Sequence, residues 1–370
     1  MPAAAPSAAS RLGRVLIVDD SAVARAVLAR VVDGSDGLRV VGSVPTATAA
    51  LAFLQAAQVD LVILDIHMPG IDGLTALPGL LAAGRGAKVL IVSSSAGEGA
   101  AGAIQALALG AADTLVKPSP GERSRGFETG LIEKLEHLLV PGRRSSTPPV
   151  APGPVAPTPA ATVALGPSID AFDVVAIGAS TGGIHALSHL LRALPAAMST
   201  PIMVTQHLPA SFMPYFAAQL ALLAGRPCEV AADRMRLRPG RIVVAPGDAH
   251  LRCVSLGNGS GAVRLSTDPA ASGCLPSVDP MFDSVADCFG ARALGVVLSG
   301  MGRDGVAGAR RLTAAGGCLV AQDEASSVVW GMPGAVAAAG LTSALLDPAA
   351  LGALIASRRR PLLPPPVTAA

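Results

Sequence analysis

The sequence predicts two α/β domains, each built on a mainly parallel β-sheet with helices on both faces. Short runs rich in Val, Ile and Leu alternate with Ala- and Leu-rich segments along the chain. Continuous apolar strands joined by helices are typical of parallel sheets that are buried on both faces. The chain has 370 residues, which is too long for one ordinary domain and about right for two. A Pro-rich stretch between the two halves supports this division.

The Pro-rich stretch, residues 141–170, contains many X-Pro steps, which exclude a helix, and too little apolar periodicity for a strand. We expect an extended linker here. It separates a first domain over 12–140 from a second domain over 171–358. The ends, 1–11 and 359–370, are expected to be a disordered N-terminus and a frayed tail.

Five strands are expected in the first domain, each a short apolar run. They cover residues 14–20, 38–44, 59–66, 88–94 and 113–118. Amphipathic segments between and after these runs are expected to be helices that begin near Ser21, Thr46, Asp72, Glu98 and Phe127. This alternation predicts a doubly wound sheet, in which functional residues gather at the carboxyl ends of the strands.

The second domain repeats the alternation of apolar runs and helical segments. Its expected strands cover residues 172–179, 201–207, 241–247, 293–300 and 318–322. Between Val230 and Thr267 the spacing changes to strand, turn and strand, with GNGSG at 257–261 as a hairpin turn. We therefore expect a Rossmann-like, mainly parallel sheet with an antiparallel extension.

The composition excludes several classes of function. Aromatic residues make up 2% of the chain, and 28 basic residues balance 26 acidic ones to a net charge of +2, so we expect no nucleic-acid partner. The long uncharged runs at 193–225 and 325–346 are broken by proline and glycine, so we expect no direct insertion into a membrane. The first residues, MPAAAPSAAS, lack the features of a signal peptide, which predicts a cytoplasmic protein.

The five cysteines are spaced singly and form no CxxC pair. This spacing predicts small core residues in a reducing compartment, and neither a disulfide framework nor a zinc site. The cysteines stand at positions 228, 253, 274, 288 and 318.

Polar residues follow four of the strands expected in the first domain. Asp19 and Asp20 end the first strand, Asp65 the third, Ser93 the fourth and Lys117 the fifth. Three carboxylates at one edge repel one another unless a divalent cation neutralises them, and such oxygen ligands suit Mg²⁺. One of the carboxylates can then act as a nucleophile toward a phosphoryl group. A single Asp at a strand end is equally well explained as a helix N-cap, but the whole set is not.

The motifs at these strand ends resemble those of the response-regulator receiver family over residues 12–140. They are D-D, D-x-x-M-P-x-x-D-G, S and K-P, in chain order. The resemblance implies a flavodoxin-like sheet of order 2-1-3-4-5 and phosphorylation of Asp65 by a histidine kinase. It implies that Ser93 and Lys117 sense the phosphoryl group. It also implies that Mg²⁺ is held by three carboxylates and one backbone carbonyl, those of Asp19, Asp20, Asp65 and His67. Receivers usually carry Tyr or Phe where Thr114 stands, so the route of the signal stays open.

The segment AIGASTGG, at 176–183, follows an apolar strand and precedes a helix. Its glycines permit a tight turn at a helix N-terminus. A dinucleotide site would need G-x-G-x-x-G and an acidic residue ~20 positions further on, and neither is present. The alternative, G-x-S-x-G, places Ser180 on a sharp turn as a nucleophile elbow does.

A nucleophilic serine needs a histidine base and an acid that orients it. His207 ends the strand at 201–207 and is the first choice for the base; His250, just past another strand, is the second. His185 and His189 are four residues apart on a helix, without a further ligand nearby in sequence, which favours a surface or packing role.

The orienting acid is expected in SGMGRDG, at 299–305, which follows another apolar strand and opens a helix. Asp304 would reach the same edge of the sheet, and the Gly-flanked Met301 could offer a backbone N–H to an oxyanion. A helix N-cap is the structural alternative for Asp304. The order Ser–His–Asp differs from that of α/β-hydrolases, which indicates a separate scaffold.

Six motifs of the second domain together resemble the catalytic domain of the chemotaxis protein-glutamate methylesterases. They are GASTGG, QHLP, APG-x-x-H, PSVDPMF, GMGRDG and AQDEASSVVWGMP. With the receiver in front, the resemblance covers nearly the whole chain. It implies that Ser180 is the nucleophile, His207 the general base and Asp304 its orienting acid. Thr181 is implied as a supporting hydroxyl, and the Met301 backbone as part of the oxyanion hole.

The implied activity is hydrolysis of glutamyl methyl esters on methyl-accepting chemotaxis receptors, with deamidation of receptor glutamines as a related reaction. The resemblance implies no cofactor for the esterase, a chemotaxis histidine kinase as phosphodonor, and control of access to the catalytic residues by the receiver. Two alternatives stay open: an esterase or deamidase acting on a non-chemotaxis signalling protein, and a non-catalytic output module.

Two positions depart from the usual pattern of the second domain. Cys274 stands where relatives often have His, and Gly334 replaces an Arg that commonly follows GMP. We expect both departures to affect surface or substrate contacts rather than the triad.

Overall fold

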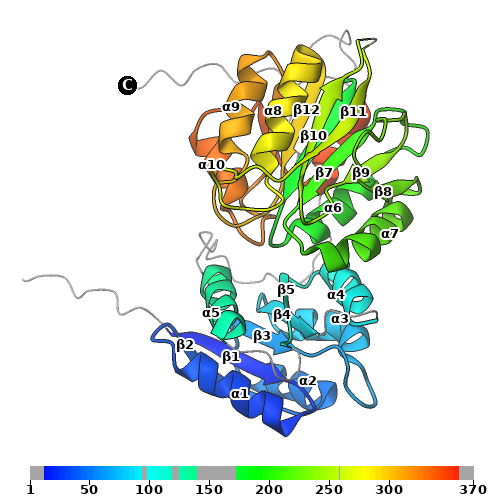
Figure 1. The fold of residues 1–370 in the computed structure, drawn as a ribbon. Coiled ribbons are helices and arrows are strands. Elements are labelled where there is room, and N and C mark those ends of the chain that lie inside the picture. The colour runs from blue at the N-terminus through cyan, green and yellow to red at the C-terminus, as the bar shows by residue number, and fades with distance from the viewer. Residues whose placement is uncertain (1–11, 94–97, 119–124, 140–171, 258, 358–370) are drawn as a thin grey trace, which may run out of the picture. The chain divides into compact units, whose positions relative to one another are not determined.

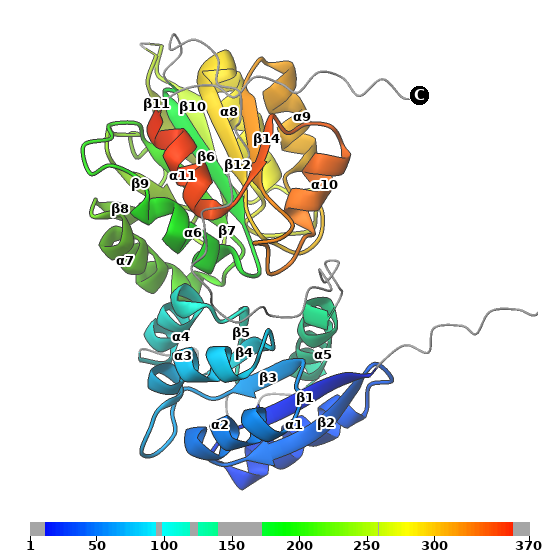
Figure 2. The same ribbon diagram turned by 180° about the vertical axis from the view of Figure 1, so that it is seen from behind.

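The computed structural model describes residues 12–93, 98–118, 125–139, 172–257 and 259–357 (Figures 1 and 2). The chain divides into two compact units between Val140 and Pro141. The predicted N-terminal segment, linker and tail, at 1–11, 141–170 and 359–370, lie outside the described residues.

The first unit is a five-stranded sheet of order β2-β1-β3-β4-β5, and all neighbouring strands are parallel. This confirms the predicted doubly wound fold. The strands are β1 (Gly13–Val18), β2 (Leu38–Val44), β3 (Leu61–Leu64), β4 (Lys88–Ser93) and β5 (Asp113–Val116). The central strands are almost wholly buried, as their continuous apolar sequences require.

The helices of the first unit are α1 (Ala22–Asp33), α2 (Ala47–Ala56), α3 (Gly73–Ala83), α4 (Glu98–Leu109) and α5 (Arg125–Leu139). Helices α1 and α5 cover one face of the sheet, and α2, α3 and α4 cover the other (Figures 1 and 2). Three predicted starts, Ser21, Thr46 and Asp72, are N-caps whose side chains accept a hydrogen bond from the backbone N–H three residues on. Helix α5 begins at Arg125, two residues before the expected position.

The second unit contains a seven-stranded parallel sheet of order β14-β13-β12-β6-β7-β9-β8. Its strands are β6 (Val174–Ala179), β7 (Ile202–Gln206), β8 (Cys228–Val230), β9 (Ile242–Val244), β12 (Ala293–Val297), β13 (Cys318–Gln322) and β14 (Ala344–Leu346). Strands β8 and β14, of three residues each, were not predicted; β9 is equally short but stands in the longer apolar run at 241–247. Strand β6 lies between β12 and β7, so the carboxyl ends of these three strands are neighbours.

Helices cover both faces of this sheet. Helices α8, α9 and α10 lie on one face, and α6, α7 and α11 on the other (Figures 1 and 2). They are α6 (Gly183–Arg192), α7 (Met213–Ala224), α8 (Val278–Phe289), α9 (Val306–Ala314), α10 (Met332–Ala338) and α11 (Pro348–Ser357), and short 3-10 turns cover 210–212 and 290–292. No helix among these described residues has both the length and the apolar character to cross a membrane.

The predicted antiparallel pair is present as β10 (His250–Ser255) and β11 (Gly261–Ser266). It forms a two-stranded sheet of its own and does not extend the parallel sheet. The physical reason is packing: apolar residues of the hairpin, such as Leu251 and Val263, join Phe282 and Val285 of α8 in the buried core of the unit. The hairpin therefore adds a layer over α8.

Candidate functional site

The three side chains expected to act together in the second unit do lie together. Ser180 follows β6, His207 follows β7, and Asp304 lies in the loop after β12. His207 Nδ1 lies 3.2 Å from Ser180 Oγ, and its Nε2 lies 2.8 Å from Asp304 Oδ2. The arrangement is a continuous hydrogen-bonded chain from hydroxyl to imidazole to carboxylate, which is the geometry of a serine-hydrolase triad.

Ser180 is held by a turn that only small residues allow. Gly182 has φ +76°, and a Cβ there would lie 2.5 Å from Cβ of Val328. At Gly183, the first residue of α6, a Cβ would lie 2.7 Å from Cβ of Ala179. The Gln206 side-chain amide donates to the Ser180 carbonyl at 2.8 Å. The nucleophile-elbow interpretation thus has a steric basis in this chain.

Asp304 is 3% exposed and accepts hydrogen bonds of 3.0 Å or less from three groups besides His207. These donors are the Ser277 hydroxyl at 2.7 Å, the Val278 N–H at 2.7 Å and the Gly305 N–H at 3.0 Å. Burial by itself raises the pKa of Asp304, but the hydrogen bond and charge of His207 and the bonds from Ser277 and Val278 lower it to about 2. The carboxylate therefore stays ionised and favours the imidazole tautomer with its proton on Nε2. The Nδ1 lone pair then faces the Ser180 hydroxyl.

His250, the second choice for the base, is fully engaged elsewhere. It is 1% exposed; its Nδ1 accepts the Ser277 N–H at 2.9 Å, and its Nε2 donates to the Asp268 carbonyl at 2.8 Å. Both ring nitrogens are used, so His250 has no lone pair for a substrate proton. Its position supports Ser277, whose hydroxyl contacts Asp304. Sequence reasoning missed this link, although Ser277 stands in the PSVDPMF motif.

Ser277 is expected to be a positioning residue. Ser277→Ala removes one hydrogen bond to the buried Asp304 carboxylate, and a bond to a charged group is worth about 1.5–3 kcal/mol. We expect kcat for ester hydrolysis to fall about tenfold or more, because ~1.4 kcal/mol in the barrier is tenfold in rate. Methanol release by the variant measures this loss, and an unchanged kcat would show that Ser277 does not position Asp304.

The backbone beside Ser180 fits the expected oxyanion site. A Cβ on Gly300 would lie 2.9 Å from Cβ of Ser180, so the 299–302 loop runs against the nucleophile. In the described part of the chain, the N–H of Met301 has no hydrogen-bond acceptor. Thr181 is buried, and its carbonyl accepts a hydrogen bond from the Ser299 hydroxyl at 2.8 Å. The roles of the Met301 N–H and the Thr181 hydroxyl in catalysis stay predictions.

Asp279, in the first turn of α8, is a second carboxylate close to Asp304. Its N–H donates to Asp304 Oδ1 at 3.4 Å, and its Oδ1 accepts the Gly308 N–H at 2.8 Å. Burial, followed by the charge of Asp304, raises the pKa of Asp279 to about 6 against the opposing effect of the Gly308 bond. The ionised carboxylate therefore lowers the stability of the fold at neutral pH.

Replacing Asp279 with Asn is expected to raise the melting temperature at pH 7.5 and to leave it nearly unchanged at pH 4. Between the ordinary pKa of 3.8 and the folded value of about 6, the folded state binds more protons than the unfolded state. Stability is therefore lost as pH rises through this window, and the amide removes that loss while keeping the acceptor for Gly308. A gain of about 2–4 °C corresponds to ~1 kcal/mol in a domain of this size. Equal shifts at both pH values would contradict the explanation.

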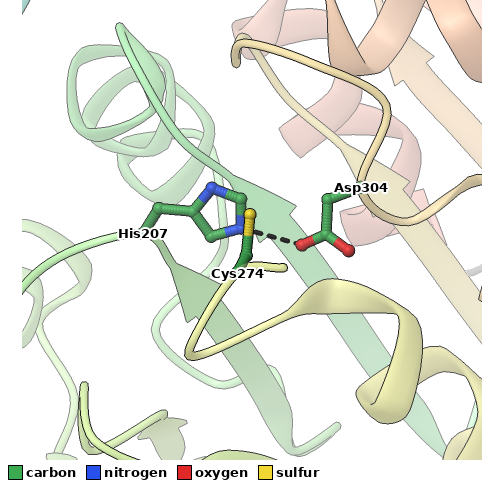
Figure 3. Close-up of side chains that lie close together, drawn as sticks. All are labelled: His207, Cys274 and Asp304. Carbon is green, nitrogen blue, oxygen red and sulfur yellow. Dashed lines mark hydrogen bonds and ion pairs between the residues drawn. The ribbon is translucent and has the colours of Figure 1, made fainter. Parts of the chain in front are cut away.

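Cys274 lies beside two of the triad residues, which the sequence did not predict. Its Sγ, a ring nitrogen of His207 and a carboxylate oxygen of Asp304 all lie within 4.8 Å of one another (Figure 3). Cys253 and Cys318 are buried as expected. Cys228, Cys274 and Cys288 are half-buried, so the expected core position is wrong for these three. Burial and then the charge of Asp304 raise the pKa of the Cys274 thiol.

His185 and His189 lie on the first and second turns of α6 with their ring centroids 4.6 Å apart. No third His, Cys, Asp or Glu of the described residues lies close enough to complete a metal site with them. This agrees with the surface or packing role expected for the pair.

In the first unit, Asp19, Asp20 and Asp65 lie together, with one carboxylate oxygen of each within 4.8 Å of the others. Lys117 Nζ donates to Asp19 Oδ2 at 3.0 Å and to Asp65 Oδ2 at 2.7 Å. Burial opposes the charge of Lys117, but its hydrogen bonds and ion pairs with Asp65 and Asp19 raise its pKa. Asp19 and Asp65 are buried, whereas Asp20 is exposed.

Strands β4 and β5 carry two buried hydroxyls, and Gly73 and His67 lie against Asp65 itself. The hydroxyls of Ser93 and Thr114 are buried and have no hydrogen-bond partner in the part of the chain that the structure describes. A side chain at Gly73 would collide with the Asp65 carbonyl, so glycine is required there. His67 is exposed, and its N–H donates to Asp65 Oδ1 at 3.3 Å. Coordination by the His67 carbonyl stays a prediction.

Comparison with known proteins matches each unit separately. Residues 175–355 match the family described as CheB methylesterase, and residues 15–125 match the response regulator receiver domain. Protein-glutamate methylesterase/protein-glutamine glutaminase 1 of Paramagnetospirillum magneticum is 40% identical over 362 residues, which cover 92% of this chain and 94% of the relative. The chain belongs to the protein-glutamate methylesterase/protein-glutamine glutaminase family. A second member, from Caulobacter vibrioides, is 41% identical over 94% of this chain and 99% of the relative.

The family assignment agrees with the two sites. The Ser180 chain of hydrogen bonds lies within the CheB methylesterase match, and the carboxylate cluster lies within the receiver match. Among solved structures, the catalytic domain of Thermotoga maritima CheB methylesterase is 31% identical, covers 51% of this chain and 98% of that one, and has a TM-score of 0.48. The two family matches and the curated relatives confirm the predicted resemblance to receivers and methylesterases.

Proposed function

We propose that this chain is a phosphorylation-regulated protein-glutamate methylesterase that removes methyl groups from glutamate side chains of methyl-accepting chemotaxis receptors. The observation that carries the proposal is the hydrogen-bonded chain of Ser180, His207 and Asp304. Relatives at about 40% identity over most of the chain bear the name of this activity and of protein-glutamine glutaminase. A non-catalytic output module would have no need to keep a buried carboxylate and an imidazole in this arrangement. No observation favours a non-chemotaxis substrate.

The reaction begins when His207 Nδ1 takes the proton of the Ser180 hydroxyl as the oxygen attacks the ester carbonyl. Asp304 holds the ring and stabilises the imidazolium that forms. The negative charge that develops on the substrate oxygen is stabilised by backbone N–H groups, for which the Met301 N–H is suited. His207 then protonates the leaving methoxide, and methanol departs.

Water completes the reaction by the same steps in reverse. His207 removes a proton from the water, which attacks the glutamyl ester of Ser180, and the proton returns to the serine oxygen. The products are the free receptor carboxylate and the original enzyme. With a glutamine side chain the first leaving group is ammonia, so deamidation needs no additional residue.

In the first unit, Asp65 is proposed to accept a phosphoryl group from a chemotaxis histidine kinase. The carboxylates of Asp19, Asp20 and Asp65, with the His67 carbonyl, would hold Mg²⁺, and the clustering of their oxygens fits this hard cation. When bound, the ion would neutralise the charge of the carboxylates and the entering phosphoryl group. The ion pair of Lys117 with Asp65 supports its pairing with phosphoryl oxygens. The Ser93 hydroxyl is buried and has no hydrogen-bond partner among the described residues, which supports a role in hydrogen bonding to them. We place these reactions in the cytoplasm.

The activity is tested by incubating the full-length protein with receptor membranes that carry methyl-labelled glutamates. Volatile methanol is measured, and ammonia release is measured from receptors that retain glutamine. We expect methanol release that depends on enzyme concentration. Receptor methylation that stays constant at high enzyme concentration, with the protein folded, would overturn the proposed function.

A further inference from the structure

The cluster of His207, Cys274 and Asp304 has the composition of a metal site (Figure 3). The three residues come from different segments: the end of β7, the segment before α8 and the loop after β12. Their ligand atoms all lie within 4.8 Å of one another. Around a tetrahedral zinc ion with bonds of ~2.0–2.3 Å, ligand atoms are roughly 3.3–3.8 Å apart. Shifts of about half an ångström to one ångström would bring these atoms to one ion.

The ligand types also agree with zinc. An imidazole nitrogen, a thiolate sulfur and a carboxylate oxygen are its usual protein ligands, and three of them leave a fourth position for water. We propose that Zn²⁺ binds to His207, Cys274 and Asp304 and reversibly inhibits the enzyme. The binding site stands on the geometry of this cluster, and the inhibition rests on the proposed esterase function.

The ion would replace the proton between His207 and Asp304 and would leave the other hydrogen bonds of Asp304 in place. His207 Nε2 and Asp304 Oδ2 are 2.8 Å apart and share one proton, and the ion would take the place of that proton. The bonds that Asp304 accepts from Ser277 and Gly305 use Oδ1 and can persist. The contact between His207 and Asp304 has to open by about half an ångström, and Cys274 Sγ has to move closer to both. Asp304 Oδ2 also accepts the Val278 N–H at 2.7 Å and would bind the ion through its other lone pair.

Proton balance explains why binding would inhibit. The Cys274 thiol loses its proton to solvent and binds as a thiolate, and Asp304 binds in its ionised form. The imidazole proton moves from Nε2 to Nδ1, so that the Nε2 lone pair binds the metal. One proton is released for each ion bound. Nδ1–H of His207 then faces Ser180 Oγ as a donor, and the lone pair that should accept the serine proton is lost.

Cys274 supplies what the triad itself lacks. The triad alone offers one nitrogen and one carboxylate, and the thiolate is the third and softest ligand. Cys274 and Asp304 both line an open groove with Met301, Gly302 and Ser272, so an ion can enter from solvent. No hydrogen bond joins Cys274 to Ser180, His207 or Asp304 in the described structure, so its replacement leaves the triad intact.

The test measures methanol release by the full-length protein over a series of buffered free Zn²⁺ concentrations. Millimolar Mg²⁺ is present throughout, so that zinc does not act through the receiver carboxylates. We expect inhibition that a chelator reverses. The rate of each variant is compared with its own zinc-free rate, and Cys274→Ser is expected to require at least tenfold more zinc for half-inhibition. Cys288→Ser, which removes another half-buried thiol, is the matched control and should stay as sensitive as the wild type.

A second readout does not depend on esterase activity. Co²⁺ bound to a thiolate gives a sulfur-to-metal charge-transfer band in the near ultraviolet. We expect this band in the wild type and in Cys288→Ser, its displacement by Zn²⁺, and its loss in Cys274→Ser. A protein that shows the band but releases no methanol would overturn the proposed function and support the metal site. Equal zinc sensitivity, or an equal cobalt band, in the wild type and Cys274→Ser would overturn the inference.

Discussion

Replacing Ser180 with alanine is expected to lower kcat for methyl-ester hydrolysis by about 10⁴- to 10⁶-fold, the loss typical of a removed nucleophile. The hydroxyl is the atom that forms the acyl intermediate, and no other hydroxyl is bonded to His207 Nδ1 in the described part of the chain. The fold should be unaffected, because the Ser180 backbone holds the turn: its carbonyl accepts a hydrogen bond from the Gln206 side-chain amide, and its N–H donates to the Ser299 carbonyl. Methanol release from methyl-labelled receptors, with circular dichroism as a check of folding, measures both expectations.

Ser188→Ala is the matched control for this experiment. Ser188 lies on α6, the helix that follows Ser180, is fully buried, and among the described residues donates to the His185 carbonyl at 2.7 Å. Its loss is expected to lower stability slightly and to leave the rate near that of the wild type. If Ser180→Ala retained more than about one part in a hundred of the wild-type rate with a native spectrum, the nucleophile would have to be another group.

Sequence reasoning predicted best the positions of the buried strands and the edge of the sheet at which their carboxyl ends gather. Apolar runs are a direct consequence of burial on both faces, so the strands that carry Ser180, His207 and Asp65 could be placed. Parallel strands gather their carboxyl ends at one edge, which explains why residues 27 and 97 positions from His207 in sequence contact it. The family resemblance implied the strand order of the first unit, and the order of the second unit was not predicted, since periodicity does not define which strands are neighbours.

The contacts that the sequence did not predict are those between segments that are distant in sequence but adjacent in the fold. Ser277 and Cys274 lie in the segment before α8, and His250 begins β10. Ser277 contacts Asp304, His250 contacts Ser277, and Cys274 lies beside His207 and Asp304, so each contact joins segments that are separate in sequence. A lone cysteine gives no sign that an imidazole lies beside it. The hairpin at 250–266 was predicted, but its packing on α8 is a property of the whole core.

Replacing Asp65 with asparagine is expected to abolish phosphorylation completely. The reason is chemical: the carboxylate oxygen is the nucleophile that forms the acyl phosphate, and an amide cannot form it. Incubation of the full-length protein with Mg²⁺ and a labelled small-molecule phosphodonor, or with a phosphorylated kinase, measures incorporation. The variant should retain the basal esterase rate of the unphosphorylated wild type and should not respond to the phosphodonor.

Asp72→Asn is the matched control, because it makes the same chemical change seven residues away. Asp72 caps α3 by accepting the Thr75 N–H at 2.6 Å, and Asn is an equally good N-cap, so labelling of Asp65 should persist.

The response of the esterase to labelling tests the regulatory half of the proposal. A phosphoryl group adds a charge of about −1.5 to −2 beside Lys117, and the buried hydroxyls of Ser93 and Thr114 are available to rearrange. Thr114 moves less side-chain volume than Tyr or Phe would, so we expect weaker activation than an aromatic residue gives, and stronger activation in Thr114→Phe. Full labelling of Asp65 in the wild type without any change in methanol release would contradict regulation by phosphorylation and leave the phosphoacceptor assignment intact.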